Sequence, residues 1–586
     1  MRQWMVAAKK ADFYVIAEKF HVDPVVARII RNREVIGEKN IRIYLGGNLS
    51  DLSDPHQMKD MDRLVEILAQ KIRKQVHIRI IGDYDVDGVT SSHLFLTALR
   101  RVGAKVDVVI PHRIQDGYGL SLHLLQQAKE DGVDTILTCD NGIAAIDEIA
   151  WAKAQKMTVL VTDHHAVPFE EHEGRRTEKK SLADAVVNPH QQDCGYPYKE
   201  LCGAGVAWNV IRVLYENYDM DKREAEDLLD FVAMATVCDV MSLTGENRIL
   251  VKEGLKRIRH TKNIGLQALM QACNVQPENI SAYHFGYVLG PCVNATGRLD
   301  TARHALRLFE TGQETEAEEI ARDLVDLNQE RKELTLQGVE MAKKLCEEGG
   351  YENDPVLVLF LPDVHESIAG LIAGRIREMY NRPVFVLTRG EEGVKGSGRS
   401  TENYSMYENM CGCVELFTKF GGHPMAAGLS LPEENVEKFR RKINENCPLT
   451  VEEVCPDIHI DMAMPVGYAS TELVHQFALL EPFGKDNPSP LFADRNLSIS
   501  RMWLIGKNRN VLRMSVLSEY GQPVPVIFFG DVETLFAYFT EKFGQEEVEN
   551  ALHGRKNRIL FSMVYTAKID FYQGNENLQL EMKYYR

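Results

Sequence analysis

Three aspartates lie within five residues of one another in the segment DYDVDG, at Asp83, Asp85 and Asp87. Carboxylates this close repel one another unless a cation neutralises them, so the segment predicts a metal site. The same spacing begins the calcium loop of an EF-hand. That loop needs a bidentate glutamate where this chain has Leu94, and the residues before Asp83 have the pattern of a strand. The segment therefore predicts a divalent-cation site that is not an EF-hand. Taken alone, it could also be a polar turn without a metal.

Further acids and imidazoles follow the ends of other predicted strands. Asp140 ends the strand in TILTCDNG, and Asp163, His164 and His165 end the strand in VLVTDHH. Because ligands of open parallel sheets bind outside the carboxyl ends of the strands, these side chains are expected to meet in one crevice. Asp239 interrupts the apolar stretch FVAMATVCDV, where a carboxylate needs a partner or a metal. Each residue alone has a structural explanation, but together they predict convergent ligands.

The donor types indicate the metal and the reaction. Carboxylates combined with one or two imidazoles favour Mn²⁺, Mg²⁺ or a similar ion over a zinc centre built from thiolates. Two such ions sharing one carboxylate would hold the attacking and leaving oxygens of a displacement at phosphorus, so phosphoester hydrolysis is predicted. The chain lacks a GxxxxGK[ST] loop, which argues against nucleotide-driven work. The GAG of LCGAGVAW lacks the third glycine of a dinucleotide fingerprint and is interpreted as a closely packed helix start.

Strands and helices alternate from residue 76 to residue 165, beginning with VHIRII, DYDVDG and VTSSHLFLTALRRVG. This alternation implies right-handed crossovers and a doubly wound parallel sheet, so the fold class is predicted as α/β. A second, smaller α/β region opens at PVLVLFLP, and the short strands after EPFGKDNPSPLF predict a small β-barrel. The predicted domains are an N-terminal helical brace (1–70), the metal-binding α/β domain (71–300), a connector helix (301–350), the second α/β domain (351–465), and a linker with the β-barrel (466–586).

Composition narrows the class of protein. The chain has 586 residues, of which 44% are hydrophobic and 26% charged, as is typical of a multidomain globular protein and not of a disordered one. Its formal net charge of -17 argues against a generally basic nucleic-acid coat, so a polyanion would have to meet a local basic patch. The cysteines form no CxxC pair, no apolar run is long enough to span a membrane, and the N-terminus lacks a secretory pattern. A cytoplasmic protein without structural disulfides is expected.

Four motifs resemble those of the DHH phosphoesterases, a family named for a run equivalent to Asp163, His164 and His165: DYDVDG, TCDNGI, VTDHH and ATVCDV. Within that family the chain is similar to exonucleases that degrade single-stranded DNA from the 5′ end. The similarity covers nearly the whole chain and includes PCVNATGRL, GSGRS, FGGHPMAAGLSL and EPFGKDNPSPLF. It implies a DHH domain, a DHH-associated domain and a C-terminal OB-like nucleic-acid-binding domain.

The resemblance also implies roles for individual residues. One or two Mn²⁺ or Mg²⁺ ions would be bound by Asp85, Asp87, Asp140, His164 and Asp239, with Asp140 as the bridge. His165 would stabilise charge at the scissile phosphate or assist the leaving oxygen, and Asp83 would act beside the ligands. A 5′ phosphate would be bound by Arg113, Ser397 and Arg399, and the nucleotide path would be lined by Asn294, Arg298 and His423.

The predicted β-barrel is the candidate surface for a long strand. An acidic chain needs a concentrated basic and aromatic patch to hold DNA, because cations neutralise phosphates and aromatic rings stack on bases. The competing interpretation is a strand-rich domain whose aromatic rings are mostly core. The candidate residues of the patch are Arg501, Trp503, Lys507, Arg509, Arg513, Lys568, Tyr572, Lys583 and Tyr584.

Other functions compete with a processive exonuclease. A DHH phosphodiesterase for short oligonucleotides or other small phosphoesters would not need the β-rich tail. An inactive binding module is disfavoured because all four motifs are intact, and a structural metal-binding protein leaves the glycine-rich phosphate features unexplained. The resemblance implies DNA repair and recombination, with a helicase and a single-strand-binding protein as possible partners.

The chain departs from the family pattern at four positions outside the metal motifs. Cys292 stands where such chains often carry Arg, Val364 and Ser367 replace a Trp and a Gly, and Asp486 replaces a Gly. These departures are expected to affect substrate binding and processivity more than catalysis at the metal site, because none of them lies in a metal motif.

Overall fold

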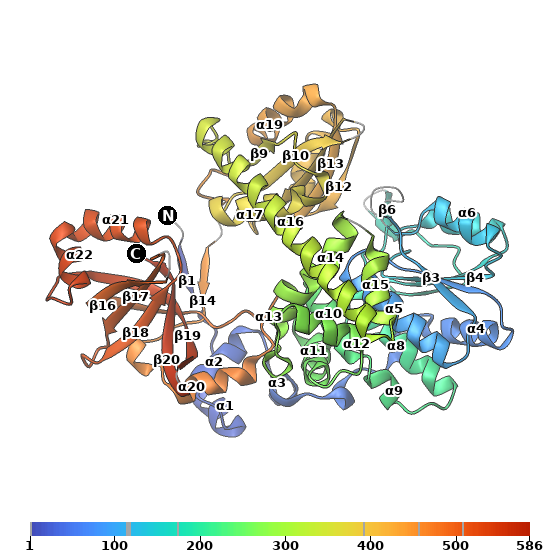
Figure 1. Ribbon diagram of the computed structural model, residues 1–586, viewed down its shortest axis with the longest axis horizontal. Helices are drawn as coiled ribbons and strands as arrows, with labels where there is room; N and C mark the ends of the chain where they lie inside the picture. The colour runs from blue at the N-terminus through green and yellow to red at the C-terminus, as the bar shows by residue number, and fades with distance from the viewer. Residues whose placement is uncertain are drawn as a thin grey trace. The chain divides into compact units, whose positions relative to one another are not determined.

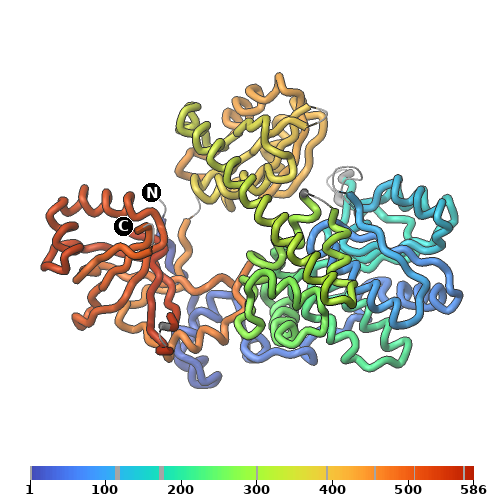
Figure 2. Tube along the Cα trace, in the orientation of Figure 1, coloured from blue at the N-terminus to red at the C-terminus, as the bar shows by residue number. Residues whose placement is uncertain are grey.

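The computed structural model describes residues 3–112, 119–172, 175–299, 301–390, 393–454, 457–506, 509–572 and 574–586. The chain forms two compact units (Figure 2). One is Leu49–Pro456, and the other combines Gln3–Asn48 with Asp457–Arg586. Among the described residues, none of the helices combines the length and the apolarity that crossing a lipid bilayer requires.

The first unit opens with a parallel five-stranded sheet, of which β3 and β4 are labelled in Figure 1. Its strand order is β3-β2-β4-β5-β8. Helices α4, α5 and α8 cover one face of the sheet and α6 and α7 cover the other, so both faces are buried against apolar side chains. The predicted doubly wound α/β fold is confirmed. The bounds are β2 (Ile78–Ile81), β3 (Val106–Val109), β4 (Thr135–Cys139), β5 (Thr158–Thr162), β8 (Ala185–Val187), α4 (Met61–Arg73), α5 (Val86–Arg101), α6 (Leu122–Glu130), α7 (Ile146–Ala154) and α8 (Gly203–Asn217).

A layer of helices follows the sheet and ends in the long helix α16 (Glu314–Glu348). Near its start, Ala321 and Leu324 of α16 lie in the core of the first α/β part, and further on, Val339 and Ala342 lie in the core of the second. The helix therefore passes from one core to the other. The other helices of the layer are α9 (Arg223–Glu226), α10 (Leu229–Cys238), α11 (Gly245–Ile258), α12 (Ile264–Ala272), α13 (Ala282–His284), the π-helical turn η4 (Phe285–Leu289), α14 (Gly290–Leu299) and α15 (Ala302–Glu310).

The second α/β part is smaller and has a mixed sheet in the order β12-β13-β11-β10-β9. Only β9 and β10 run parallel, and the other neighbouring pairs are antiparallel. Helix α17 covers one face of this sheet and α18 and α19 cover the other. The bounds are β9 (Leu357–Phe360), β10 (Val384–Gly390), β11 (Gly393–Arg399), β12 (Lys419–His423), β13 (Ala426–Leu431), α17 (Glu366–Tyr380), α18 (Met406–Cys411) and α19 (Val436–Glu445).

The second unit contains the predicted β-barrel. Its sheet has the order β15-β16-β17-β18-β20-β19, and an additional pairing of β16 with β19 closes it. Two helices absent from the sequence-based prediction, α21 (Val532–Phe543) and α22 (Gln545–Leu552), stand between β18 and β19. The strands are β15 (Met462–Ala463), β16 (Phe492–Ile505), β17 (Val511–Leu517), β18 (Pro523–Phe528), β19 (Leu560–Tyr572) and β20 (Asn575–Tyr585).

The N-terminal helices belong to this second unit. Apolar residues of α2 (Pro24–Asn32), among them Val26 and Ile30, are fully buried in one core with the barrel strands. Arg33 donates to both carboxylate oxygens of Asp461 at 2.7 and 3.2 Å, and the pair is almost completely buried. The structure thus separates residues 3–48 from residues 49–70, which the sequence-based ranges place together. The physical reason is that the apolar face of α2 has its partners more than 400 residues away in sequence.

Candidate metal centre

Three neighbouring strands of the parallel sheet carry the chemical groups at one edge. Asp83 follows β2, Asp140 follows β4, and the run from Asp163 to His165 follows β5, in the strand order β2-β4-β5. Parallel strands bring their carboxyl ends to the same edge, so these side chains converge as predicted from the sequence. Asp239 reaches them as the residue that ends α10.

The converging side chains form three overlapping groups in which every potential ligand atom lies within 4.8 Å of the others. The Nε2 atom of His164 lies 3.1 Å from Asp140, 3.7 Å from Asp87 and 3.6 Å from Asp239. Asp140 and His164 each take part in two groups, which fits a shared position between two ions. The groups are Asp83 with Asp85 and Asp140, Asp87 with His164 and Asp239, and Asp140 with His164 and His165.

The electrostatics of this cluster call for a cation. Burial and the nearby Asp85 carboxylate raise the pKa of Asp83 to about 8, and burial with Asp87 and Asp85 raises the pKa of Asp140 well above its usual value. Among the described residues, Asp83 Oδ1 is buried without a hydrogen-bond partner, and Asp140 Oδ1 and His164 Nε2 are buried 3.1 Å apart without forming a hydrogen bond. Burial also lowers the pKa of His164 and so favours the neutral, metal-binding imidazole. Buried unpartnered oxygens together with imidazole nitrogen fit Mn²⁺ or Mg²⁺.

Asp87 is held by the start of α8. The backbone N–H groups of Gly203 and Ala204 donate to its two carboxylate oxygens at 2.6 and 2.7 Å, and the positive end of the helix dipole favours the charge. A Cβ atom on Gly203 would lie 2.6 Å from the Cβ of Asp140, so only glycine allows this approach. The interpretation of GAG as a closely packed helix start is confirmed, and the element it packs against is the metal cluster.

Asp163 orients His165, a role that sequence reasoning missed. Its Oδ1 accepts from His165 Nδ1 at 2.8 Å, while its Oδ2 accepts from the Ile143 backbone N–H at 2.9 Å. Burial lowers the pKa of His165, but hydrogen bonding and attraction to Asp163 outweigh it and raise that pKa to about 9. The only sequence signal was an acid directly before two histidines at a strand end.

Helix α14 carries two predicted path residues. Asn294 accepts from the backbone N–H of Val86 at 3.2 Å, so its side chain supports the loop that bears the aspartates. Arg298 donates to the backbone carbonyl of Ser367 in the second α/β part at 2.6 Å. Both residues therefore have structural contacts in addition to their predicted roles.

A cavity of about 490 Å³ brings Arg298 together with Ser397 and Arg399. Tyr84, from the aspartate loop, lines the same cavity. Of the other predicted substrate contacts, His423 is exposed at the end of β12 and does not line this cavity, and Arg113 lies outside the described residues. The structure thus groups three of the six predicted substrate residues in one cavity.

The departures from the family pattern lie in different surroundings. Cys292 is buried on the side of α14 that faces α16, where its Sγ accepts from Asn328 at 3.3 Å, and Ser367 lines the 490 Å³ cavity. Val364 is buried in the core of the second α/β part. Asp486 has a φ of 59°, a conformation that favours glycine.

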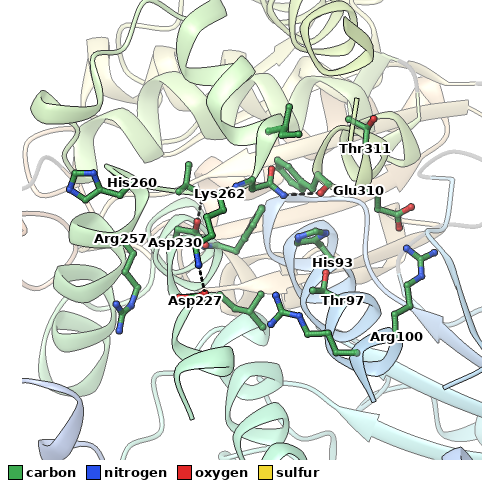
Figure 3. Close-up of a pocket in the computed structure, with 18 of the residues that line it drawn as sticks. His93, Thr97, Arg100, Asp227, Asp230, Arg257, His260, Lys262, Glu310 and Thr311 are labelled. Atoms are coloured by element: carbon green, nitrogen blue, oxygen red, sulfur yellow. Dashed lines mark hydrogen bonds and ion pairs between the residues drawn. The ribbon is translucent and has the colours of Figure 1, made fainter. Parts of the chain in front are cut away.

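Another cavity, of about 780 Å³, lies elsewhere in the first unit (Figure 3). It lies among α5, α10, α11 and α15, where burial lowers the pKa of His93 to about 3 and raises that of Asp230 to about 6. The cavity involves the end of α5 and the start of α10, whereas the metal cluster lies at the opposite ends of these two helices. None of the described groups with metal-ligand spacing lines it. The candidate metal centre at the sheet edge and this cavity are therefore separate features of the first unit.

Three family descriptions match successive parts of the chain. The DHH family, N-terminal domain, matches residues 77–236, the DHHA1 domain matches residues 353–447, and the RecJ OB domain matches residues 460–584. The acids and histidines from Asp83 to His165 lie within the first match, and Ser397 and Arg399 lie within the second.

Several curated proteins are similar over most of the chain. The single-stranded-DNA-specific exonuclease RecJ of Haemophilus influenzae is 32% identical over 582 residues, covering 96% of each chain. That of Escherichia coli is 32% identical with 95% of each covered. The Bacillus subtilis RecJ is 33% identical over 511 residues, which are 86% of this chain but 63% of that longer protein.

Solved structures agree with the fold. The crystal structure of RecJ in complex with Mn²⁺ from Thermus thermophilus superimposes with a TM-score of 0.79 at 24% identity, covering 100% of this chain and 79% of that one. A crystal structure of exonuclease RecJ bound to manganese gives a TM-score of 0.57 at 32% identity, covering 66% of this chain and 94% of that one.

Proposed function

The chain belongs to the RecJ family of DHH phosphoesterases, and from this we propose that it is a metal-dependent exonuclease that degrades single-stranded DNA from the 5′ end. The observation that carries the proposal is the convergence of buried, unpartnered carboxylate oxygens and imidazole nitrogen at three adjacent strand ends. We propose Asp85, Asp87, Asp140, His164 and Asp239 as the ligands of one or two Mn²⁺ or Mg²⁺ ions. Asp83 lies close enough to Asp85 and Asp140 to act with them.

The surrounding residues prepare this site for hydrolysis at phosphorus. A divalent ion held by these residues would supply Lewis acidity and would make water a better nucleophile at neutral pH. Two N–H groups at the start of α8 fix the orientation of Asp87. Because Asp163 engages Nδ1 of His165, only Nε2 of that ring can face the substrate, where its proton can stabilise phosphate charge or pass to the leaving oxygen.

A direct assay tests the proposal. Purified protein with Mn²⁺ is incubated with end-labelled single-stranded and duplex DNA and RNA, each with or without a 5′ phosphate, and product length is followed over time. The proposal expects progressive shortening of single-stranded DNA from its 5′ end. Hydrolysis confined to very short oligonucleotides would instead support the small-substrate phosphodiesterase.

The cavity with Ser397 and Arg399 is the proposed 5′-phosphate pocket. Replacing both residues with alanine is expected to slow degradation of 5′-phosphorylated strands more than of 5′-hydroxyl strands, because arginine binds phosphate through charge-assisted, often bidentate hydrogen bonds. A competition assay containing both strand types measures the ratio of their degradation rates. The matched control is Arg389→Ala, which removes an exposed arginine of the same sheet that pairs with Glu433. Equal loss for both strand types would make the residues general path contacts.

The barrel surface is the proposed platform for longer strands. Trp503 has the guanidinium groups of Arg501 and Arg513 at 5.7 and 5.9 Å from its ring centroid, which gathers three of the predicted residues into one patch. Lys568 and Lys583 both pair with Glu581, and this reduces their value for phosphate binding. Arg509 is exposed, and Tyr584 is partly buried against a small apolar core with Ile458 and Val564. Lys507 and the side chain of Tyr572 lie outside the described residues.

Replacing Trp503 and Arg513 with alanine is expected to weaken binding of long single strands and shorten processive runs, with cleavage of very short oligonucleotides preserved. The ring offers stacking and each phosphate contact contributes about 0.7 to the salt slope, so the slope should fall by about that amount. Binding is measured against salt concentration. Arg558→Ala, which removes an exposed cation paired with Glu547 in the same unit, serves as the control. An unchanged salt slope and run length would indicate that the first unit, and not the barrel, binds the long strand.

The proposed substrate also suggests partners and location. An exonuclease specific for single strands acts on duplex DNA only after the strands are separated, so we propose a helicase and a single-strand-binding protein as partners. We also propose that the protein acts in the cytoplasm. Stimulation of duplex degradation by an added helicase measures the first partnership. Equal rates on duplex with and without helicase contradict it.

A further inference from the structure

Two tyrosines on the surface of the first unit stack on each other. Tyr283 of α13 and Tyr287 of η4 have ring centroids 5.1 Å apart with an angle of 23° between the ring planes. Their side chains are 63% and 70% exposed. Large aromatic rings usually bury their faces, so a stacked pair this open presents ring surface to a planar partner.

The pair stands on a fixed support. Ser281 and His284 form a capping box that starts the helix, with Ser281 Oγ 3.0 Å from His284 Nδ1. Gly290, directly after η4, packs so closely on α10 that an added Cβ would lie 2.3 Å from the Sγ of Cys238. Cys238 also donates from Sγ to the carbonyl of Phe285 at 3.3 Å. These contacts attach the helical segment that carries the two tyrosines to Cys238 at the end of α10. Cys238 directly precedes the proposed metal ligand Asp239. A π-helical turn of this kind is frequently found at functional sites.

One face of the continuous helix leads from the tyrosines to the metal centre. Residues 283, 287, 294 and 298 are spaced by four, seven and four positions, which places them along a single helical face. Asn294 contacts the backbone of the aspartate loop, and Arg298 lines the cavity with Ser397 and Arg399. From Tyr287 to Asn294 the helix rises by about 10 Å, which is the length of about three nucleotides in a stacked strand.

We propose that Tyr283 and Tyr287 form a stacking subsite for a base of the single-stranded substrate, a few nucleotides from the metal centre. The inference rests on the proposed function and adds a contact that positions the strand. Stacking on an aromatic face suits every base, so the subsite binds without sequence preference. The continuity of this face with Asn294 and Arg298 favours nucleic acid over a protein partner, which would not need to reach the metal centre.

The first test compares alanine with phenylalanine at both tyrosines, in full-length protein made inactive by Asp140→Asn. Binding of labelled single strands of about two and about twelve nucleotides is measured by fluorescence anisotropy. Tyr283→Ala with Tyr287→Ala is expected to weaken binding of the longer strand by about 5- to 100-fold, with little effect on the shorter one. Tyr283→Phe with Tyr287→Phe keeps the rings and should bind like the parent. Tyr14→Ala removes a 76% exposed tyrosine of the other unit and is the matched control.

A second test needs no substitution at the tyrosines. 2-Aminopurine is placed at successive positions of the strand, and its fluorescence in complex with the Asp140→Asn protein is expected to be quenched most strongly at one position a few nucleotides from the end. A quenching maximum that the phenylalanine variant keeps and the alanine variant loses supports the subsite. Uniform quenching, or alanine variants that bind the longer strand like the parent, overturns it and leaves the pair to a structural or protein-docking role. Failure of the wild-type enzyme to degrade single-stranded DNA at all would instead contradict the proposed function.

Discussion

Replacing Asp140 with asparagine is expected to reduce nuclease activity by at least about 100-fold while the protein stays folded. Asp140 belongs to two of the three ligand groups, so its loss disturbs the whole cluster and not one ligand alone. Its pKa is raised by burial and by neighbouring carboxylates, which means that its charge costs stability when no cation is bound. The metal-free variant should therefore unfold at the same temperature as the metal-free wild type or at a higher one.

The measurements are turnover of a labelled single strand at increasing Mn²⁺ and thermal unfolding with and without Mn²⁺. Metal that binds only the folded state raises the melting temperature. Mn²⁺ should therefore raise the melting temperature of the wild type by more than that of the variant. Asp193→Asn is the matched control, because Asp193 is exposed and pairs only with Lys59 among the residues described here. Turnover of Asp140→Asn near that of wild type at saturating Mn²⁺ would contradict the shared-ligand assignment.

Gly203→Ala is expected to impair catalysis without changing any chemical group. The added Cβ would lie 2.6 Å from the Cβ and 3.0 Å from the Cα of Asp140, so either α8 or the end of β4 has to move. Movement of α8 also shifts the N–H groups that hold Asp87. A displacement of about 1 Å in such a site can cost about 100-fold in rate, and the stabilisation by Mn²⁺ should shrink with it.

Gly205→Ala, two residues along the same helix, is the matched control. A Cβ at that position would make ordinary contacts of 3.4 Å with Leu201. Alanine also favours a helix over glycine by up to about 1 kcal/mol, so this variant should be active and at least as stable as wild type. Equal activity of the two alanine variants, measured as kcat and as the Mn²⁺ dependence of melting, would show that the approach of α8 to Asp140 is not required.

The residue types and positions of the metal centre could be predicted from the sequence. Asp140 and the DHH run directly follow apolar strand patterns and Asp83 follows one after a single glycine, and a parallel sheet brings such strand ends to one edge. The doubly wound fold could also be predicted, because the alternation of strands and helices is visible in the local hydrophobic pattern of this one sequence. The chemistry of the centre is therefore determined by short segments.

Contacts between distant segments were decided only by the tertiary structure. Nothing local in the sequence pairs Gly203 with Asp140, or α2 with the barrel strands. The engagement of His165 by Asp163 and the support of the aspartate loop by Asn294 likewise depend on side-chain directions that residue spacing does not specify. Periodic patterns report which face of an element is apolar, but not which other apolar face covers it. That choice depends on packing and on closing long loops, so it exists only once the whole chain has folded.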